Sequence, residues 1–156
     1  MHLSSGSAGP AEALRIEGAA RGLLRGIGHL TQTLFKAGDF GLTRSQVAVL
    51  DALEPGACRV TGLAARTGMA QPRVTVLLQK LEEAGLVARQ RCPDDRRAVR
   101  TELTSAGRDL LERGRRRMAG ALLAALDGGI EDSEQAVRAA RDAIAVLVDA
   151  MESETS

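Results

Sequence analysis

The segment from residue 60 to residue 107 restricts the fold more than any other part of this chain. Within it, residues 71–84 carry apolar side chains at the i, i+3, i+4 and i+7 spacing that gives a helix one buried face. Pro72 fits the first turn of this helix, where its missing N–H has no intrahelical partner, and Gly85 is suited to end it. The pattern therefore predicts an amphipathic helix whose inward stripe consists of Val74, Leu77, Leu78 and Leu81.

A shorter helix and a tight turn are predicted immediately before it. Gly68 supplies the turn, and Thr61 is a candidate cap for the shorter helix. Its inner face consists of Leu63, Ala64 and Thr67. Two helices joined by such a turn are typical of the helix-turn-helix, which places the first half of its second helix against base edges in a DNA major groove. The candidate contacts there are Gln71, which is expected on the DNA backbone, and Arg73, Thr75, Val76 and Gln79.

A β-hairpin is predicted directly after these helices. Two short runs with β-branched residues, 86–92 and 98–104, flank the turn sequence at 93–97. Between Arg89 and Arg100 the hairpin contains five arginines and two aspartates, and this local charge of +3 favours phosphate contacts through counterion release. A solvated surface hairpin is the alternative. Its position after a helix-turn-helix instead favours the wing of a winged helix-turn-helix that binds duplex DNA.

Four segments in this order resemble a known family: Gly41–Leu50, Leu81–Arg89, Pro93–Arg97 and Leu103–Gly107. Over about residues 15–150 the chain resembles the multiple-antibiotic-resistance regulator (MarR) family of bacterial transcription factors. The resemblance implies a homodimer with a winged domain on each subunit, which binds a pseudo-palindromic operator. It also implies that Asp95 and Arg97 form the wing tip, where the aspartate steadies the arginine as it enters the minor groove. The candidate wing contacts to the minor groove and to phosphates are accordingly Asp95, Arg96 and Arg97.

One position departs from the usual pattern of that family. Many members carry an arginine or another polar residue where this chain has Val76. Apolar contact with thymine methyl groups can replace hydrogen bonding at such a position. The operator sequence is therefore not transferred from the family.

Three further helices are predicted outside this unit, at 12–36, 105–126 and about 132–151, each with an apolar stripe on one side. We expect the first and last helices of two subunits to cover these stripes in a dimer, and an intrachain three-helix bundle is the alternative. The expected organisation is a disordered N-terminus (1–10), a helical dimerisation region (11–40 and 105–152) and a winged helix-turn-helix domain (41–104). The fold class is mainly α with a small β-hairpin wing.

Charge is separated along the chain, although its net value is only +1. Residues 127–156 contain eight acids and two arginines, a local charge of −6, so this end is expected to point away from DNA. No run of about eighteen apolar residues and no basic start followed by an apolar run is present. The sequence therefore predicts a cytoplasmic protein without a membrane partner.

A small-molecule effector is the usual signal in the family that this chain resembles. Such an effector needs a cavity between the winged domain and the dimer helices, and it must favour one spacing of the two recognition helices to have any effect. The candidate wall residues are His29, Gln32, Phe35 and Lys36 on the first helix and Gln46 on the second. Each of them is equally compatible with helix surface or ordinary packing, and the effector's identity is not predicted.

Other functions find less support in the sequence. Catalysis is not expected, because His2 and His29 are the only histidines and no glycine-rich phosphate loop is present. No cofactor or metal is expected, and a zinc site with His29 and one cysteine is the remaining metal hypothesis. Oxidant sensing through Cys92, beside the wing arginines, is a second functional hypothesis, and a protein that kept the fold to sequester a ligand or partner is a third. The leading interpretation is a dimeric, effector-responsive transcriptional repressor.

Overall fold

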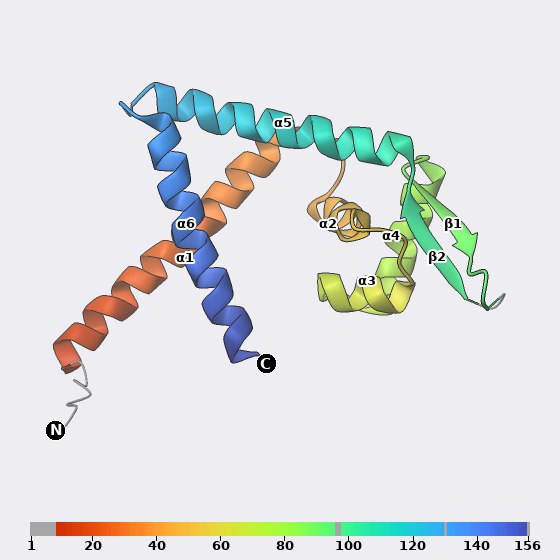
Figure 1. Cartoon of the computed structure of the whole chain (residues 1–156), viewed down its shortest axis with the longest axis horizontal. Coiled ribbons are helices and arrows are strands. Elements are labelled where there is room, and N and C mark those ends of the chain that lie inside the picture. The colour runs from red at the N-terminus through yellow and green to blue at the C-terminus, as the bar shows by residue number, and fades with distance from the viewer. Residues whose placement is uncertain (1–8, 96–97, 130, 156) are drawn as a thin grey trace.

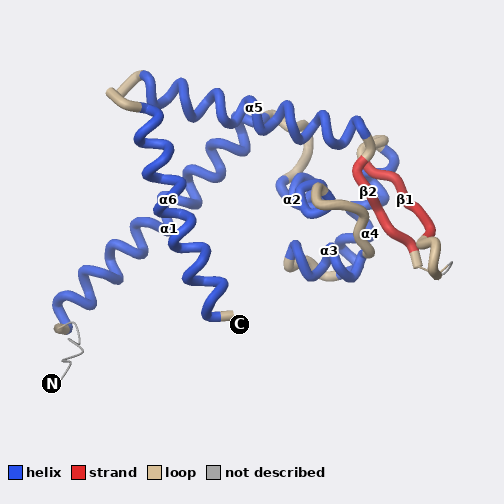
Figure 2. Tube along the Cα trace, in the orientation of Figure 1, coloured by secondary structure: helices blue, strands red, loops and turns tan. Residues whose placement is uncertain are grey.

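The computed structural model describes residues 9–95, 98–129 and 131–155 of the 156-residue chain. Its elements follow the order α1 (Pro10–Gly38), α2 (Arg44–Leu53), α3 (Val60–Thr67), α4 (Gln71–Glu83), β1 (Val87–Arg91), β2 (Val99–Leu103), α5 (Ser105–Asp127) and α6 (Ser133–Glu154). Helices α2, α3 and α4 and the antiparallel hairpin β1–β2 gather beside one end of the long helix α5, and α6 turns back from its other end (Figure 1). The strands lie at the outer edge of this winged unit, next to α4 (Figure 2).

The start of α2 is fixed by its own sequence. The Thr43 hydroxyl accepts a hydrogen bond from the Gln46 backbone N–H (3.2 Å), and the Gln46 amide oxygen accepts one from the Thr43 N–H (2.9 Å). This reciprocal capping box satisfies two N–H groups that the helix leaves without intrahelical partners. Helix α2 therefore begins at a defined residue, shortly after the end of α1 in the chain.

Helix α3 begins earlier than its local capping signal indicates, so the prediction that Thr61 caps it is wrong. Its N-cap is Arg59, without a side-chain cap hydrogen bond. Just before it, the backbone groups of Cys58 and Thr101 exchange two hydrogen bonds of 2.9 Å, which hold the chain extended up to the helix start. This pairing with the wing outweighs the capping preference of a threonine. The predicted turn is confirmed, with Gly68 in the left-handed region at φ 70°.

Helix α4 and the wing follow the predicted order. Pro72 lies in the first turn of α4, and Gly85 follows the helix at φ 75°. Strand β1 pairs with β2 from Val87 opposite Leu103 to Arg91 opposite Val99. Cys92 was predicted within the strand run but lies just beyond β1, where its N–H donates to the Ala98 carbonyl (2.9 Å). The sheet is therefore short, and the predicted runs 86–92 and 98–104 extend past it on both sides.

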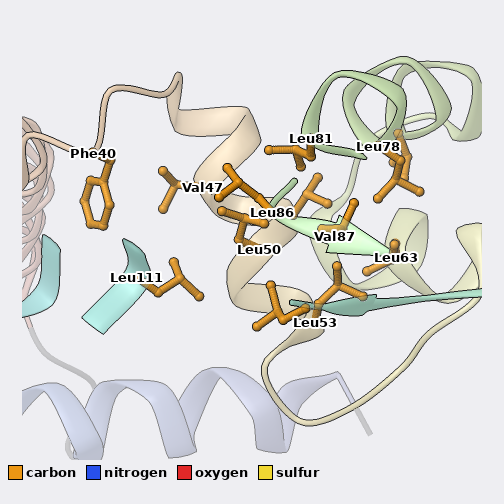
Figure 3. Packing of buried hydrophobic residues seen from close by; sticks show 13 residues of the cluster. Phe40, Val47, Leu50, Leu53, Leu63, Leu78, Leu81, Leu86, Val87 and Leu111 are labelled. Atoms are coloured by element: carbon orange, nitrogen blue, oxygen red, sulfur yellow. The ribbon is translucent and has the colours of Figure 1, made fainter. Parts of the chain in front are cut away.

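The hydrophobic core lies inside the winged unit and extends to α5 (Figure 3). Phe40 packs against two glycines, because a Cβ added at Gly114 would lie 2.0 Å from the Phe40 ring and one added at Gly38 would lie 2.5 Å from it. Leu111 of α5 is buried on the same side of the cluster. The α5 backbone thus seats directly on the winged unit. Among the described residues, the fully buried leucines and valines are Val49, Leu50, Leu53, Leu63, Val74, Leu78, Leu81 and Leu111.

The terminal helices leave their apolar stripes in solvent. Helix α1 packs on α5, yet Gly38 is its only buried residue, and no described residue of α6 is buried. The single chain therefore does not form the alternative three-helix bundle. Of the segment predicted to be disordered, residues 1–8 lie outside the described residues, and Pro10 already belongs to α1. Among the described residues, none of the helices combines the length and the apolar composition that a membrane span requires.

Candidate nucleic-acid interface

Helix α4 presents its polar side chains on the surface opposite its core stripe. Val74, Leu78 and Leu81 are buried, whereas all five predicted contact residues are exposed: Gln71, Arg73, Thr75, Val76 and Gln79. At about 100° per residue, Val76 and Gln79 are the two of these five residues that point most directly away from the buried stripe. The first half of α4 therefore offers an exposed ridge to a partner.

The two flanks of that ridge differ in their contacts. On one flank, the Arg73 guanidinium donates to the Ser45 hydroxyl (2.8 Å), which ties the start of α4 to the start of α2. On the other flank, Thr75 lines a groove of about 300 Å³ between α4 and the wing. Its hydroxyl donates to the Gln71 carbonyl one turn earlier (3.0 Å). Arg73 and Thr75 thus border the ridge, with Val76 between them.

The inner face of the wing, which faces α4, is buried near its base and basic toward its tip. Directly opposite residues of an antiparallel pair point to the same side of the sheet, and alternate residues along one strand share that side. Near its base this face is buried, through Val87, Thr101 and Leu103. Toward the tip the same face carries Arg89 and Arg91, which line the groove beside α4. The groove therefore has a basic wall formed by the wing.

Charges along α4 favour its N-terminal half for contact with a polyanion. Arg73 is the ionisable side chain in the first half, whereas Glu82 and Glu83 lie in the last turn. The Arg89 guanidinium Nε lies 2.7 Å from a Glu82 carboxylate oxygen, and both side chains are about half exposed. The acidic end of α4 is thereby partly compensated by the wing. The basic groove therefore attracts a polyanion, such as a phosphate backbone, more strongly than the acidic C-terminal end of α4 does.

Part of the predicted wing tip is not described by the structure. Asp95 is exposed, and its carbonyl accepts a hydrogen bond from the Ala98 N–H (3.0 Å). Arg96 and Arg97 lie outside the described residues, so their minor-groove and phosphate contacts stay predictions. The sequence analysis counted Arg89 and Arg91 in the basic charge of the hairpin but did not place them at a contact site, and it did not single out Ser45. Strand alternation from the apolar Val87 is the sequence signal that would have placed both arginines on the inner face.

A second candidate site lies between α1, α2 and α5, where a cavity of about 320 Å³ opens. Phe35 and Phe40 stack with ring centroids 5.5 Å apart, and the Arg44 guanidinium carbon lies 5.7 Å from the Phe35 centroid. Asp51 and Arg115 form a charged part of the wall. The volume and the mixed aromatic and charged lining suit a small organic molecule.

Of the effector-binding residues predicted from the sequence, the structure brings only Phe35 to this cavity. Gln46 is engaged in the capping box of α2, and His29 lines a separate, open depression on α1 beside Gly22 and Gly26. Gln32 is exposed on α1 and, like the exposed Lys36, lines neither space. Sequence reasoning did not find the other walls, because Phe40, Arg44, Asp51 and Arg115 come from separate segments that only the fold brings together.

Two arginines of α5 form hydrogen bonds to neighbouring elements, Arg115 to the winged unit and Arg117 to the end of α1. Arg115 donates to both carboxylate oxygens of Glu54 (2.7 and 2.6 Å) and to Asp51 (2.6 Å). The hydrogen bond from Arg115 holds the pKa of Glu54 below its ordinary value, and the same contacts raise the pKa of Arg115. Arg117 donates to the carbonyls of Gly38 and Asp39 (3.2 Å each) at the end of α1. These contacts connect α5 to the end of α2 and to the end of α1.

The two cysteines are free thiols in different surroundings. Cys92 is buried at the base of the wing tip, with 3% of its surface exposed, and Cys58 is partly buried before α3. An oxidant in solution therefore has little access to Cys92 in this conformation. Among the described residues, no three His, Cys, Asp or Glu side chains converge into a group that could hold a metal ion.

Comparison with known proteins agrees with this geometry. Residues 40–98 match the sequence profile of the MarR family. A MarR family protein from Bacillus stearothermophilus is 25% identical, over 88% of this chain and 96% of its own, with a TM-score of 0.75. A protein from Pseudomonas aeruginosa assigned as a transcriptional regulator is 27% identical, over 86% of this chain and 96% of its own, with a TM-score of 0.73.

A third similar structure is BpsR from Bordetella bronchiseptica, whose DNA binding is regulated by 6-hydroxynicotinic acid. It is 29% identical to this chain, over 81% of this chain and 98% of its own, with a TM-score of 0.52. Each match covers nearly the full length of the similar protein and at least 81% of this chain. They confirm the predicted fold class and the family resemblance of the sequence.

Proposed function

We infer that this chain belongs to the MarR family of transcriptional regulators and is not an enzyme. We propose that it represses transcription by binding a pseudo-palindromic operator as a homodimer. The observation that carries this proposal is the surface formed by α4 and the wing. An exposed ridge without acidic side chains in its first half stands beside a groove walled by Arg89 and Arg91. A recognition helix of this kind enters the major groove while the wing follows the adjacent backbone.

Gln71, Arg73, Thr75, Val76 and Gln79 are the proposed contacts of the recognition helix, and Asp95, Arg96 and Arg97 those of the wing tip. Arg89 and Arg91 add phosphate contacts along the groove. Repression requires no further surface, because a bound operator that overlaps a promoter excludes polymerase. The exposed stripes of α1 and α6 support the proposed homodimer, since apolar helix faces of this extent are normally covered. The dimerisation region is accordingly 11–40 with 105–152, and the winged domain is 41–104.

An effector in the cavity between α1, α2 and α5 would release the operator. Regulation of DNA binding in BpsR by a small aromatic acid supports this part of the proposal. The cavity is bounded by Asp51 and Arg115, and Arg115 also joins α5 to the end of α2. A ligand that favours one placement of α5 therefore changes the position of the winged unit.

The test is a fluorescence-anisotropy titration with a duplex from the region upstream of the protein's own gene, at several salt concentrations and with unrelated competitor DNA. We expect tight binding that resists the competitor and weakens steeply with salt. Weak binding that the competitor abolishes, on this duplex and on a library of random duplexes, would contradict the proposal and favour the sequestering alternative.

The oxidant-sensing alternative is tested with the same duplex. The burial of Cys92 supports the expectation that peroxide releases the wild-type protein and its Cys92→Ser variant to the same small extent. Release of the wild type alone would instead establish Cys92 as the sensor.

A further inference from the structure

Two large apolar side chains stay exposed in the described part of the winged unit, residues 40–104. Val76 on α4 is 52% exposed and Val99 on the wing is 44% exposed. The other large apolar side chains of this unit are buried or half-buried in its core. A valine that stays exposed to water does not contribute the favourable free energy that burial of its side chain would give. The described part of the chain does not bury Val76, so a partner that binds the exposed face of α4 would contact this side chain.

The position of Val76 on α4 defines what that partner meets first. It is the sixth residue of the helix and points away from the buried stripe of Val74, Leu78 and Leu81. Its polar neighbours are engaged at the flanks, since Arg73 donates to Ser45 and the Thr75 hydroxyl donates to the helix backbone. The exposed ridge of the recognition helix α4 is thus apolar at its centre, at Val76.

Among the groups that the bases present in the DNA major groove, only the thymine 5-methyl group is an apolar counterpart for an apolar side chain on this ridge. Guanine, adenine and cytosine present hydrogen-bonding groups there, whereas thymine also presents its 5-methyl group. A valine offers these bases no hydrogen bond, so it gains free energy from the methyl and none from the polar edges. We propose that Val76 selects a thymine in each operator half-site through contact with its 5-methyl group. This inference rests on the proposed function, because it assumes that α4 enters the major groove.

The experiment begins with in vitro selection of duplexes from a randomised library by the wild-type dimer. Each thymine of the selected duplex is then replaced in turn by deoxyuridine, which pairs identically with adenine and lacks only the methyl group. We expect one thymine per half-site whose replacement weakens binding about fourfold, which corresponds to about 0.8 kcal/mol for one buried methyl-sized group. Val76→Ala should bind the thymine and deoxyuridine duplexes almost equally.

Val99→Ala is the matched control, because it removes the same atoms from the other exposed valine of the unit, which lines the groove on the wing side and does not lie on α4. It can change the overall affinity for DNA. It should retain the fourfold preference for thymine. Specific binding of selected duplexes with no deoxyuridine effect, or an effect that persists in Val76→Ala, would overturn the inference and leave the proposed function standing. Failure of the library to yield any enriched duplex would overturn both together.

Discussion

At the residue scale, Gly114 is required by its contact with Phe40. A Cβ at this position would lie 2.0 Å from the ring, so Gly114→Ala forces the ring or α5 to move. We expect a loss of about 1–3 kcal/mol in the free energy of unfolding, as for other overpacked core sites. Urea denaturation at one fixed protein concentration measures it.

Gly120 provides a matched control on the same helix, because a Cβ there meets no atom within 4 Å. Gly120→Ala should stabilise the protein by about 0.5–1 kcal/mol, since alanine loses less backbone entropy in a helix. Equal effects of the two substitutions would contradict the role assigned to the Phe40 contact.

Arg91 carries the residue-scale prediction for DNA binding. Its side chain lines the groove between wing and recognition helix, so Arg91→Ala should remove about one phosphate contact per subunit. Affinity should fall for all duplexes alike, and the slope of log affinity against log salt should become shallower by about one for each phosphate that the variant no longer neutralises. Arg116→Ala removes the same charge from an exposed site on α5, where Arg116 pairs with Glu112. An unchanged slope in Arg91→Ala, or an equal change in Arg116→Ala, would place the phosphate path elsewhere.

At the element scale, local sequence predicts an element well where its signals are self-contained. Helix α4 has its apolar spacing, its first-turn proline and its terminal glycine within about fifteen residues, and the structure follows all three. Helix α3 begins where Cys58 pairs with Thr101, a residue far away in the sequence. The local cap signal at Thr61 contains no information about that pairing. The cavity was missed for the same reason, because its walls come from α1, α2 and α5.

The contact between α5 and α2 predicts a pH dependence. Hydrogen bonding to Arg115 lowers the pKa of Glu54 from its ordinary value of 4.5. A carboxyl with a lowered folded-state pKa stabilises the fold above its unfolded-state pKa, and this contribution is lost as the pH falls through the folded value. The stability difference between the wild type and Arg115→Gln should therefore be larger at pH 7 than at pH 3.

Urea denaturation at a series of pH values measures this difference. Arg116→Gln is the control, because Arg116 pairs with the exposed carboxylate of Glu112 on its own helix. A difference between the wild type and Arg115→Gln that stays constant from pH 7 to pH 3 would show that Glu54 contributes nothing through its hydrogen bonds to Arg115.

At the scale of the whole molecule, the hydrophobic core and the exposed apolar stripes lie in different parts of the fold. The buried cluster holds the winged unit against α5, and the far halves of α1 and α6 carry apolar side chains that no described part of the chain covers. The exposed set on these helices includes Leu23, Leu24, Ile27 and Leu30 on α1 and Ile144, Leu147, Val148 and Met151 on α6. The sequence predicted these stripes from their spacing. It did not predict that α6 stands away from the intrachain core, because the apolar spacing of a helix does not define the helix's direction in the fold.

The proposed dimer is tested by two valines on opposite faces of α6. Val148 shares the stripe with Ile144 and Met151, whereas Val146 lies on the opposite side of the helix, and both are exposed in the single chain, at 46% and 68%. Val148→Glu should place an unpaired charge in the subunit interface, give a monomer in analytical ultracentrifugation and weaken operator binding strongly. Val146→Glu should leave the mass and the affinity unchanged, because its side chain stays in water in the dimer. A dimer that persists in Val148→Glu, or a monomer that forms in both variants, would mean that the subunits meet through another surface.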